Sequence, residues 1–183
     1  MNKSSNIHDC LRVVTYINIR LSSFCFSLCK DILSYRNILI VSLFINNNIS
    51  FLINIYSDFS HSALKYLKNT GVDISNVLAI TGDFNIRDSF WNLMYSLHSS
   101  YSDLLLDITD SLSLGLSYLT NPVPTRYSDN DQSLNLVIDL IFLRYGIVEL
   151  DNHTIYLEWR LLLDHASLTI TIPIEYQYMD NCI

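Results

Sequence analysis

Carboxylate, amide and imidazole side chains stand at the ends of several apolar runs in this sequence. Asp83 and Asn85 follow the run VLAIT in VLAITGDFN, and His165 comes soon after three leucines in RLLLDHASL. A strand end is a rigid position from which a side chain can be aimed at a substrate. Carboxylates bind hard cations, an amide can hold a phosphate oxygen, and an imidazole can stabilise developing charge. Gathered in one place, these groups would suit metal-assisted hydrolysis of a phosphoester.

The same stretch also has a purely structural interpretation. Gly82 and Asn85 are common turn residues, and the Asp83 carboxylate could cap that turn. Asn54 and Tyr56, however, end the apolar run FLINIY in the same manner. Because several separated segments place polar residues at strand ends, the chemical interpretation is favoured over a local turn.

Asp139 is the carboxylate that burial should tolerate least, since it lies inside the apolar run LVIDLIF. A buried carboxylate without a partner costs several kcal/mol of desolvation. His165 is the expected partner, because a buried aspartate that holds an imidazole fixes its tautomer and favours its protonated form. The alternative is a core aspartate that caps a neighbouring loop.

Runs rich in β-branched and aromatic residues predict the strands that would position these groups. The predicted strands are 11–20, 37–45, 49–57, 76–81, 134–143 and 167–174. Between the second and third strands stand Asn46, Asn47 and Asn48, three consecutive amides that suit a turn. These two strands should therefore form a hairpin.

Two helices are predicted between the strands. The first begins at Ser60 or Ser62, either of which can serve as its N-cap, and ends at Gly71. The second is the amphipathic segment 102–114. Strands and helices mixed in this order favour a layered α/β sandwich.

Composition limits the class of protein. The chain has 183 residues, half of them hydrophobic, which is enough for one domain with a sizeable core, and we expect residues 1–183 to form it. Its formal net charge of -7 argues against a protein that grips nucleic acid mainly through a basic surface. Phosphate chemistry here would need a bound cation to offset that charge.

The cysteines and the start of the chain predict an intracellular protein, in the nucleus or the cytoplasm and not secreted. The four cysteines form no pair of CxxC motifs, and no signal-peptide pattern opens the sequence. The apolar stretch 37–56 suggests a membrane span, but the three asparagines at 46–48 interrupt it. We therefore expect no membrane partner.

Four short motifs, taken together, resemble a known family. TGDFN at 81–85, PTRY at 124–127, LNLVIDLIF at 134–142 and LDHASL at 163–168 occur in the order typical of the endonuclease/exonuclease/phosphatase superfamily. The sequence is most similar to the endonuclease domains of non-LTR retrotransposons, over residues 35–173. The resemblance implies the DNase I-like fold, a four-layer α/β (α+β) structure in which helices flank a two-sheet β-sandwich. It also implies cleavage of phosphodiester or phosphomonoester bonds with Mg²⁺ or Mn²⁺, and nucleic acid, DNA in the first place, as the partner. The sequence leaves RNA, a nucleotide and a phospholipid head group open as other substrates.

The resemblance also implies roles for the residues of the motifs. Asp83 would orient or deprotonate the attacking water, and Asn85 would contact the phosphate. Tyr56, in NIYSD, is similar to the active-site tyrosine of the family and would contact the phosphate or the leaving group. Asp164 is similar to the aspartate that lies close to the metal or the leaving group, and it is assigned as a metal ligand. Asn54, two residues before Tyr56, is assigned to substrate binding.

The remaining matched residues complete the implied site. His165 would stabilise the pentavalent transition state, and Asp139 would orient that histidine, as its apolar surroundings independently suggest. Thr125 and Arg126, in PTRY, would support the loop and contact the substrate strand.

One departure from the family is large. The family's principal metal ligand is a glutamate that ends an early strand, whereas the first glutamate of this chain is Glu149. Asp9 and Asp31 are the only early acids, and neither ends an apolar strand as required. We therefore expect an amino-terminally truncated copy that lacks the first strands and has weak or no nuclease activity. The alternative is a non-catalytic interaction module that keeps the fold.

The other histidines and acids suggest surface positions. His8, His61, His98 and His153 stand in polar contexts, which is typical of exposed residues rather than metal ligands. Asp103, Asp107 and Asp110 repeat at helical spacing, which fits a solvated helix face.

Overall fold

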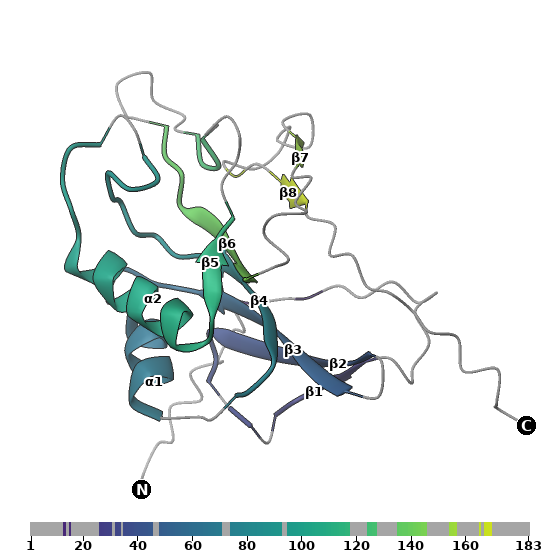
Figure 1. Cartoon of the computed structure of the whole chain (residues 1–183). Helices are drawn as coiled ribbons and strands as arrows, with labels where there is room; N and C mark the ends of the chain where they lie inside the picture. Colours follow the sequence, from purple (N-terminus) through teal and green to yellow (C-terminus); the bar gives the residue numbers. More distant parts are fainter. Residues whose placement is uncertain are drawn as a thin grey trace, which may run out of the picture.

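One six-stranded sheet forms the centre of the protein (Figure 1). The computed structural model describes residues 13, 15, 26–30, 32–33, 35–45, 48–70, 74–92, 95–117, 124–127, 135–145, 154–156, 165 and 167–169. In spatial order, the strands of the sheet are β1 (Phe26–Leu28), β2 (Ile38–Ile45), β3 (Asn48–Tyr56), β4 (Val77–Asp83), β6 (Asp139–Arg144) and β5 (Leu114–Leu116). The helices are α1 (Ser62–Thr70) and α2 (Ser100–Ser111), and β7 (Thr154–Tyr156) pairs with β8 (Ser167–Thr169) in a separate two-stranded sheet.

The expected hairpin is present. Strands β2 and β3 pair antiparallel from Ile38 opposite Ile55 to Ile45 opposite Asn48, so the chain reverses at the asparagine run. From β3 the chain passes through α1 to β4, which lies parallel to β3. Strand β6 then pairs antiparallel with β4. The sheet is therefore mixed, with one βαβ unit at its centre.

The strand directions bring three predicted site residues to one end of the sheet. The parallel strands β3 and β4 finish at Tyr56 and Asp83, which are register partners. Antiparallel β6 begins at Asp139, which is the register partner of Asp83. Directly opposed residues project from the same face of a sheet. We call this end, where β3 and β4 finish and β6 begins, the site edge.

Helices α1 and α2 lie side by side and contribute to the apolar core with the sheet (Figure 1). Leu64 of α1 and Leu105 of α2 are fully buried, together with Ile55, Ile80 and Phe142 from the three central strands. Full burial of such side chains stabilises a fold by roughly 1.5–3 kcal/mol each. The rigid central strands are thus held by the same core that supports the helices.

The helix starts differ from the sequence prediction. Helix α1 begins at Ser62, but the Asp58 carboxylate accepts hydrogen bonds from the Ser60 and Ser62 N–H groups at 3.2 and 3.3 Å. The predicted serine caps were therefore wrong, because an acid four residues before the helix satisfies its first donors. Helix α2 begins at Ser100, two residues earlier than predicted, with the Ser99 hydroxyl accepting from the Tyr101 N–H.

The predicted end of the second helix was also wrong. Helix α2 ends at Ser111, and β5 (Leu114–Leu116) begins at the last residue of the predicted helix. Ser113 has a φ of 58°, a left-handed backbone conformation that a helix cannot continue through. Ser117 then donates its N–H to Ile141 beside β5, so pairing with β6 overrides the local helical pattern.

The predicted sandwich of two sheets is not seen among the described residues. Within them the second sheet is only the pair β7 and β8, and two sheets packed face to face are not seen. Of the predicted strand 11–20 the structure describes Val13 and Thr15, and of 167–174 it describes β8. None of the helices in the described part of the chain is long and apolar enough to cross a membrane.

Candidate active site

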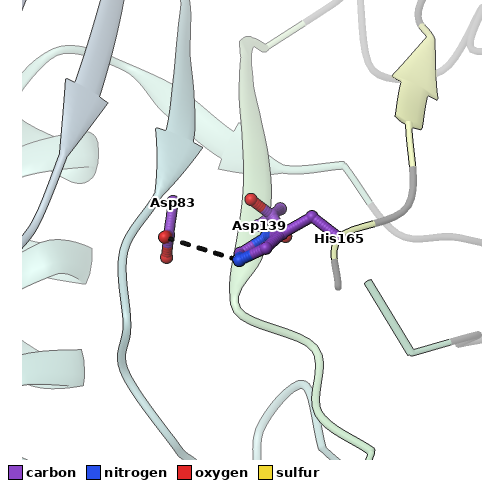
Figure 2. Close-up of side chains that lie close together, drawn as sticks. All are labelled: Asp83, Asp139 and His165. Atoms are coloured by element: carbon purple, nitrogen blue, oxygen red, sulfur yellow. Dashed lines mark hydrogen bonds and ion pairs between the residues drawn. The ribbon is translucent and has the colours of Figure 1, made fainter. Parts of the chain in front are cut away.

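Asp83, Asp139 and His165 meet at the site edge (Figure 2). Asp83 ends β4, Asp139 begins β6, and His165 stands two residues before β8. The Nδ1 atom of His165 lies 2.9 Å from the Oδ2 atom of Asp139, and its Nε2 atom lies 4.0 Å from the Oδ2 atom of Asp83. The contact between Asp139 and His165 that the apolar run predicts is therefore present.

The electrostatic balance of these groups leaves negative charge uncompensated. Burial, together with the nearby charge of Asp139, raises the pKa of Asp83 to about 6. The His165 ring, the Asn85 N–H and the Arg126 charge act in the opposite direction without cancelling the rise. A cation between the carboxylates would remove this repulsion.

These three side chains also have the geometry of a metal site. Asp83, Asp139 and His165 each offer one ligand atom, and those atoms lie within 4.8 Å of one another. Within the described ranges, no other group of three or more acidic, histidine or cysteine side chains meets that condition. All three residues are partly exposed, so a small ion could reach them.

Gly82 is required by a close approach of two strands, and its assignment to a turn was wrong. It lies within β4 with a φ of +151°. A Cβ atom at this position would lie 1.8 Å from the carbonyl oxygen of Ile55 in β3. Only glycine fits both the backbone conformation and the space. This close approach sets Asp83 beside Tyr56.

Asn85 is held by two contacts that fix the turn after β4. Its φ of 51° is left-handed, a conformation that asparagine tolerates better than most residues. The Asn85 N–H donates to Asp83 Oδ1 at 3.1 Å, so Asp83 caps the turn as the structural interpretation suggests. The Asn85 side-chain Nδ2 donates to the Ser57 carbonyl at 2.9 Å, which orients the amide.

Thr125 and Arg126 hold the segments that carry Asp139 and His165. The hydroxyl of Thr125 is buried and accepts hydrogen bonds from the Ile138 and Asp139 N–H groups, both at 3.0 Å. The backbone of Arg126 pairs with Leu136 and also forms a β-bridge with His165. The loop-supporting role expected of PTRY is present, while contact with a substrate strand stays a prediction.

Tyr56 and Asn54 project from β3. Tyr56 is the register partner of Asp83, and its N–H donates to the Asn37 carbonyl at 2.9 Å. Asn54 lies two residues deeper in the strand, and its Nδ2 donates to the Thr15 hydroxyl at 3.2 Å. Asp164, the predicted metal ligand, lies outside the described residues.

Three supporting residues were missed in the sequence. Asn92 is buried and pairs with the backbone of Val137 through both ends of its amide, at 2.9 and 2.6 Å. Ser57, fully buried, bonds its hydroxyl to the His61 ring at 2.9 Å and lies next to Tyr56. Asn37 is also buried, and its side-chain amide has no hydrogen-bond partner in the part of the chain that the structure describes. No spacing or composition signal distinguishes these residues.

Comparison with solved structures identifies the fold. The endonuclease domain of TRAS1, a telomere-specific non-LTR retrotransposon, matches with a TM-score of 0.61 and 18% identity over 81% of this chain and 67% of that one. The 3'-5' exonuclease NExo from Neisseria meningitidis matches with a TM-score of 0.51 and 17% identity over 73% and 64%. The 3' phosphatase NExo from Neisseria, bound to a product DNA hairpin, matches with a TM-score of 0.55 and 16% identity over 81% and 69%. The chain has the endonuclease/exonuclease/phosphatase fold.

The endonuclease/exonuclease/phosphatase fold agrees with the resemblance seen in the four motifs. At 16 to 18% identity, the structural matches show the fold alone. This chain spans about two thirds of the length of these structures, from 64 to 69%. No family model matches the sequence, and no curated protein matches it either.

Within this endonuclease/exonuclease/phosphatase fold, a second histidine lies between two carboxylates away from the site. His98 Nδ1 lies 2.8 Å from Asp88 Oδ2, and His98 Nε2 lies 2.9 Å from Asp103 Oδ1. Asp88 is fully buried. Its carboxylate also accepts from the Phe90 N–H, the Ser99 N–H and the Ser102 hydroxyl. Burial alone would raise the pKa of Asp88, but these hydrogen bonds hold it below its ordinary value.

Proposed function

We propose that the chain is a divalent-metal-dependent phosphodiester hydrolase domain of the endonuclease type, acting on DNA inside the cell, in the nucleus or cytoplasm. The observation that supports it most is the arrangement of Asp83, Asp139 and His165 at the site edge. The proposal also draws on the fold, because the structures it matches are named as an endonuclease domain, an exonuclease and a phosphatase bound to DNA.

His165 is the proposed stabiliser of the charge that develops on the phosphoryl group. The Asp139 carboxylate, 2.9 Å from Nδ1, fixes the tautomer and favours the protonated ring. The other ring nitrogen then presents its N–H on the side of Asp83. A donor held in place before the reaction is worth more than one that must reorganise.

Asp83 is the proposed acceptor of a proton from the attacking water. A carboxylate with a pKa of about 6 is a stronger base than an ordinary aspartate, yet it is still mostly ionised at pH 7. Asn85 lies two residues away and donates one amide hydrogen to Ser57. An amide nitrogen carries two hydrogens, so the second is the proposed donor to a phosphate oxygen.

The donor set fits a hard divalent cation, Mg²⁺ or Mn²⁺. The carboxylates of Asp83 and Asp139 offer oxygen ligands, which Mg²⁺ prefers. Burial first, and then the charge of Asp139, raises the pKa of Asp83, and a bound cation would offset both effects. Asp164, next to His165 in sequence, is proposed as a further ligand. When bound, the ion would act as a Lewis acid on the phosphoryl oxygens.

We propose that hydrolysis is slow. No glutamate precedes Glu149 in this chain, so the described site offers aspartate oxygens alone as carboxylate ligands. Fewer carboxylate ligands lower the affinity for the ion, and activity should therefore require millimolar Mg²⁺ or Mn²⁺.

Nicking of a supercoiled plasmid tests the proposal. The chain, His165→Ala and His98→Ala are incubated with Mg²⁺ or Mn²⁺ at equal concentration. We expect slow nicking that falls by about 100-fold or more in His165→Ala, the size typical for loss of one positioned donor. His98→Ala is the matched control, because that ring also lies between two carboxylates but belongs to the start of α2 and not to the site edge. Equal nicking by His165→Ala, or none by the parent chain, would favour the non-catalytic interaction module.

A further inference from the structure

Two phenylalanine rings are exposed in the loops that leave the site edge. Phe59 is 82% exposed in the loop after β3, three residues beyond Tyr56. Phe90 is 50% exposed in the loop after β4, five residues beyond Asn85. Because β3 and β4 are parallel neighbours, both loops leave the sheet at the same edge. Neither residue belongs to the buried apolar core, and the Phe90 ring stands perpendicular to the ring of Trp91, with the centroids 6.2 Å apart.

The two loops contact consecutive residues at the start of α2. In the loop after β3, the His61 ring packs on the Tyr101 ring with their centroids 4.1 Å apart. In the loop after β4, the buried Asp88 carboxylate accepts from the Ser102 hydroxyl. Since Tyr101 and Ser102 are adjacent, the two loops lie close together at the start of α2.

These loops also connect directly to the candidate site. The Ser57 carbonyl, in the first loop, accepts the hydrogen bond from the Asn85 amide at 2.9 Å. The Ser57 N–H donates to the Asp83 carbonyl at 2.7 Å. Phe59 is two residues from Ser57, so its Cα atom lies within about 8 Å of the Ser57 Cα atom. Its ring is therefore within reach of a nucleotide adjoining the site.

Two exposed arginines lie near the same edge, beside the carboxylates of the site. Arg87 is exposed, two residues beyond Asn85. Arg36 is exposed next to Asn37, whose carbonyl pairs with the Tyr56 N–H. Arg144, one of the four arginines in the described ranges, ends β6 and so lies at the end of the sheet opposite the site edge. Phosphates of a strand that enters the site would meet these arginines.

We propose that Phe59 and Phe90 stack on unpaired bases of a nucleic-acid strand whose phosphates contact Arg36 and Arg87. The inference rests on the proposed function, since it names the substrate form for the same site. An aromatic ring can stack only on a base whose face is free, and in a duplex each base face is covered by its neighbours. The preferred substrate is therefore a strand with unpaired nucleotides beside the scissile phosphate.

Fluorescence anisotropy in EDTA measures this binding without hydrolysis. The probes are a labelled single-stranded DNA of about 20 nucleotides and the duplex of the same sequence. We expect Phe59→Ala and Phe90→Ala each to weaken single-strand binding by about five-fold or more, since one stacked base contributes roughly 5- to 150-fold. Duplex binding should change by less than about two-fold, because base faces are covered there.

Phe44→Ala is the matched control. Phe44 is also 50% exposed, but it lies near the hairpin end of β2, opposite Ile49 and away from the site edge. It should bind single strands like the parent chain. Phe90→Tyr keeps an aromatic face and should bind single strands like the parent chain. Arg87→Gln should lower the slope of log affinity against log salt concentration by the amount expected for about one phosphate contact.

Three results would overturn the inference: no binding of single strands by the parent chain, the same loss in Phe44→Ala as in the two site-edge variants, or tighter binding of the duplex. The first result would assign the rings to a protein partner instead.

This inference and the proposed function can fail separately. A chain that binds single strands through its phenylalanines but nicks nothing keeps this inference and loses the proposed function. If the chain nicks plasmid while Phe59→Ala and Phe90→Ala bind single strands normally, the proposed function is kept and this inference is lost.

Discussion

Two histidines of this protein lie between two aspartates, and they serve different ends. His165 lies 2.9 Å from Asp139 and 4.0 Å from Asp83, measured between ring nitrogen and carboxylate oxygen. His98 lies 2.8 Å from Asp88 and 2.9 Å from Asp103. By residue type and distance the two clusters are nearly alike. Their surroundings distinguish them.

The difference lies in how fully each aspartate is hydrogen-bonded. The Asp88 carboxylate receives two backbone N–H groups and a hydroxyl besides His98, and its pKa is lowered. The Asp83 carboxylate receives one backbone N–H, from Asn85, and burial with the charge of Asp139 raises its pKa to about 6. A carboxylate whose charge is satisfied supports structure. One whose charge is not satisfied is available to a cation or a proton.

Removing Asp88 should produce the largest loss of stability in this comparison. Asp88→Ala leaves the part-buried Phe90 and Ser99 N–H groups without their acceptor at the start of α2, and leaves the Ser102 hydroxyl with the Ser99 carbonyl alone. We expect the free energy of unfolding in urea to fall by about 3 kcal/mol, the range for breaking a buried charged hydrogen-bond network. Asp103→Ala is the control: its side chain is 63% exposed, so its loss should stay within about 0.5 kcal/mol. Equal losses would mean that burial and hydrogen bonding do not distinguish Asp88 from the exposed Asp103.

Replacing Asp83 should raise the free energy of unfolding, whereas replacing Asp88 should lower it. Between about pH 4 and pH 6 the folded protein keeps a proton on Asp83 that the unfolded chain has released, because its folded pKa is about 6 against an ordinary value of 3.8. Stability therefore falls as the pH rises through this window and does not recover above it. Asp83→Asn keeps an oxygen for the Asn85 N–H and should raise stability at pH 8 by about 2 kcal/mol. Urea unfolding at pH 4 and pH 8 checks this; a variant that is destabilised at pH 8 would contradict it.

A divalent cation should bind at Asp83, Asp139 and His165 and stabilise the folded protein there, but it should not bind at the His98 cluster. Mg²⁺ at about ten times its Kd should raise the free energy of unfolding by about 1.4 kcal/mol, since binding to the folded state alone shifts the equilibrium. The rise should disappear in Asp83→Asn and persist in Asp103→Asn, because Asp83 belongs to the converging group and Asp103 does not. Thermal unfolding with and without Mg²⁺ measures it. A rise that survives in Asp83→Asn would place the ion elsewhere.

The sequence carried enough information for the part of the site that burial constrains. A carboxylate in an apolar run needs a partner, which made His165 the expected partner of Asp139, and the two side chains are in contact. Three consecutive asparagines between two β-branched runs likewise indicate the β2–β3 hairpin. In both cases a local pattern leaves few physical alternatives.

The remainder depends on contacts between distant segments, which no local pattern encodes. Asp88 lies in the polar stretch IRDSF and is fully buried only because the loop folds back on α2. Gly82 has the appearance of a turn residue, yet what requires it is the carbonyl of Ile55 in a neighbouring strand. The three-residue strands β1, β5 and β7 are too short for a period of two to stand out.

The smallest expected effect is a change in the pKa of the His98 ring, which measures directly how its two aspartates act on it. Its hydrogen bond to Asp103, together with the negative charge of Asp88, raises the pKa of this ring above 6.5. The stabilisation from the charged ring is therefore full below pH 6.5 and is lost as the pH rises through the folded pKa. An NMR titration of the His98 ring protons should give that raised pKa, and Asp103→Asn should lower it by removing the main cause. A pKa unchanged in Asp103→Asn would show that the exposed carboxylate only lies near the ring, and that Asp88 alone determines the charge of His98.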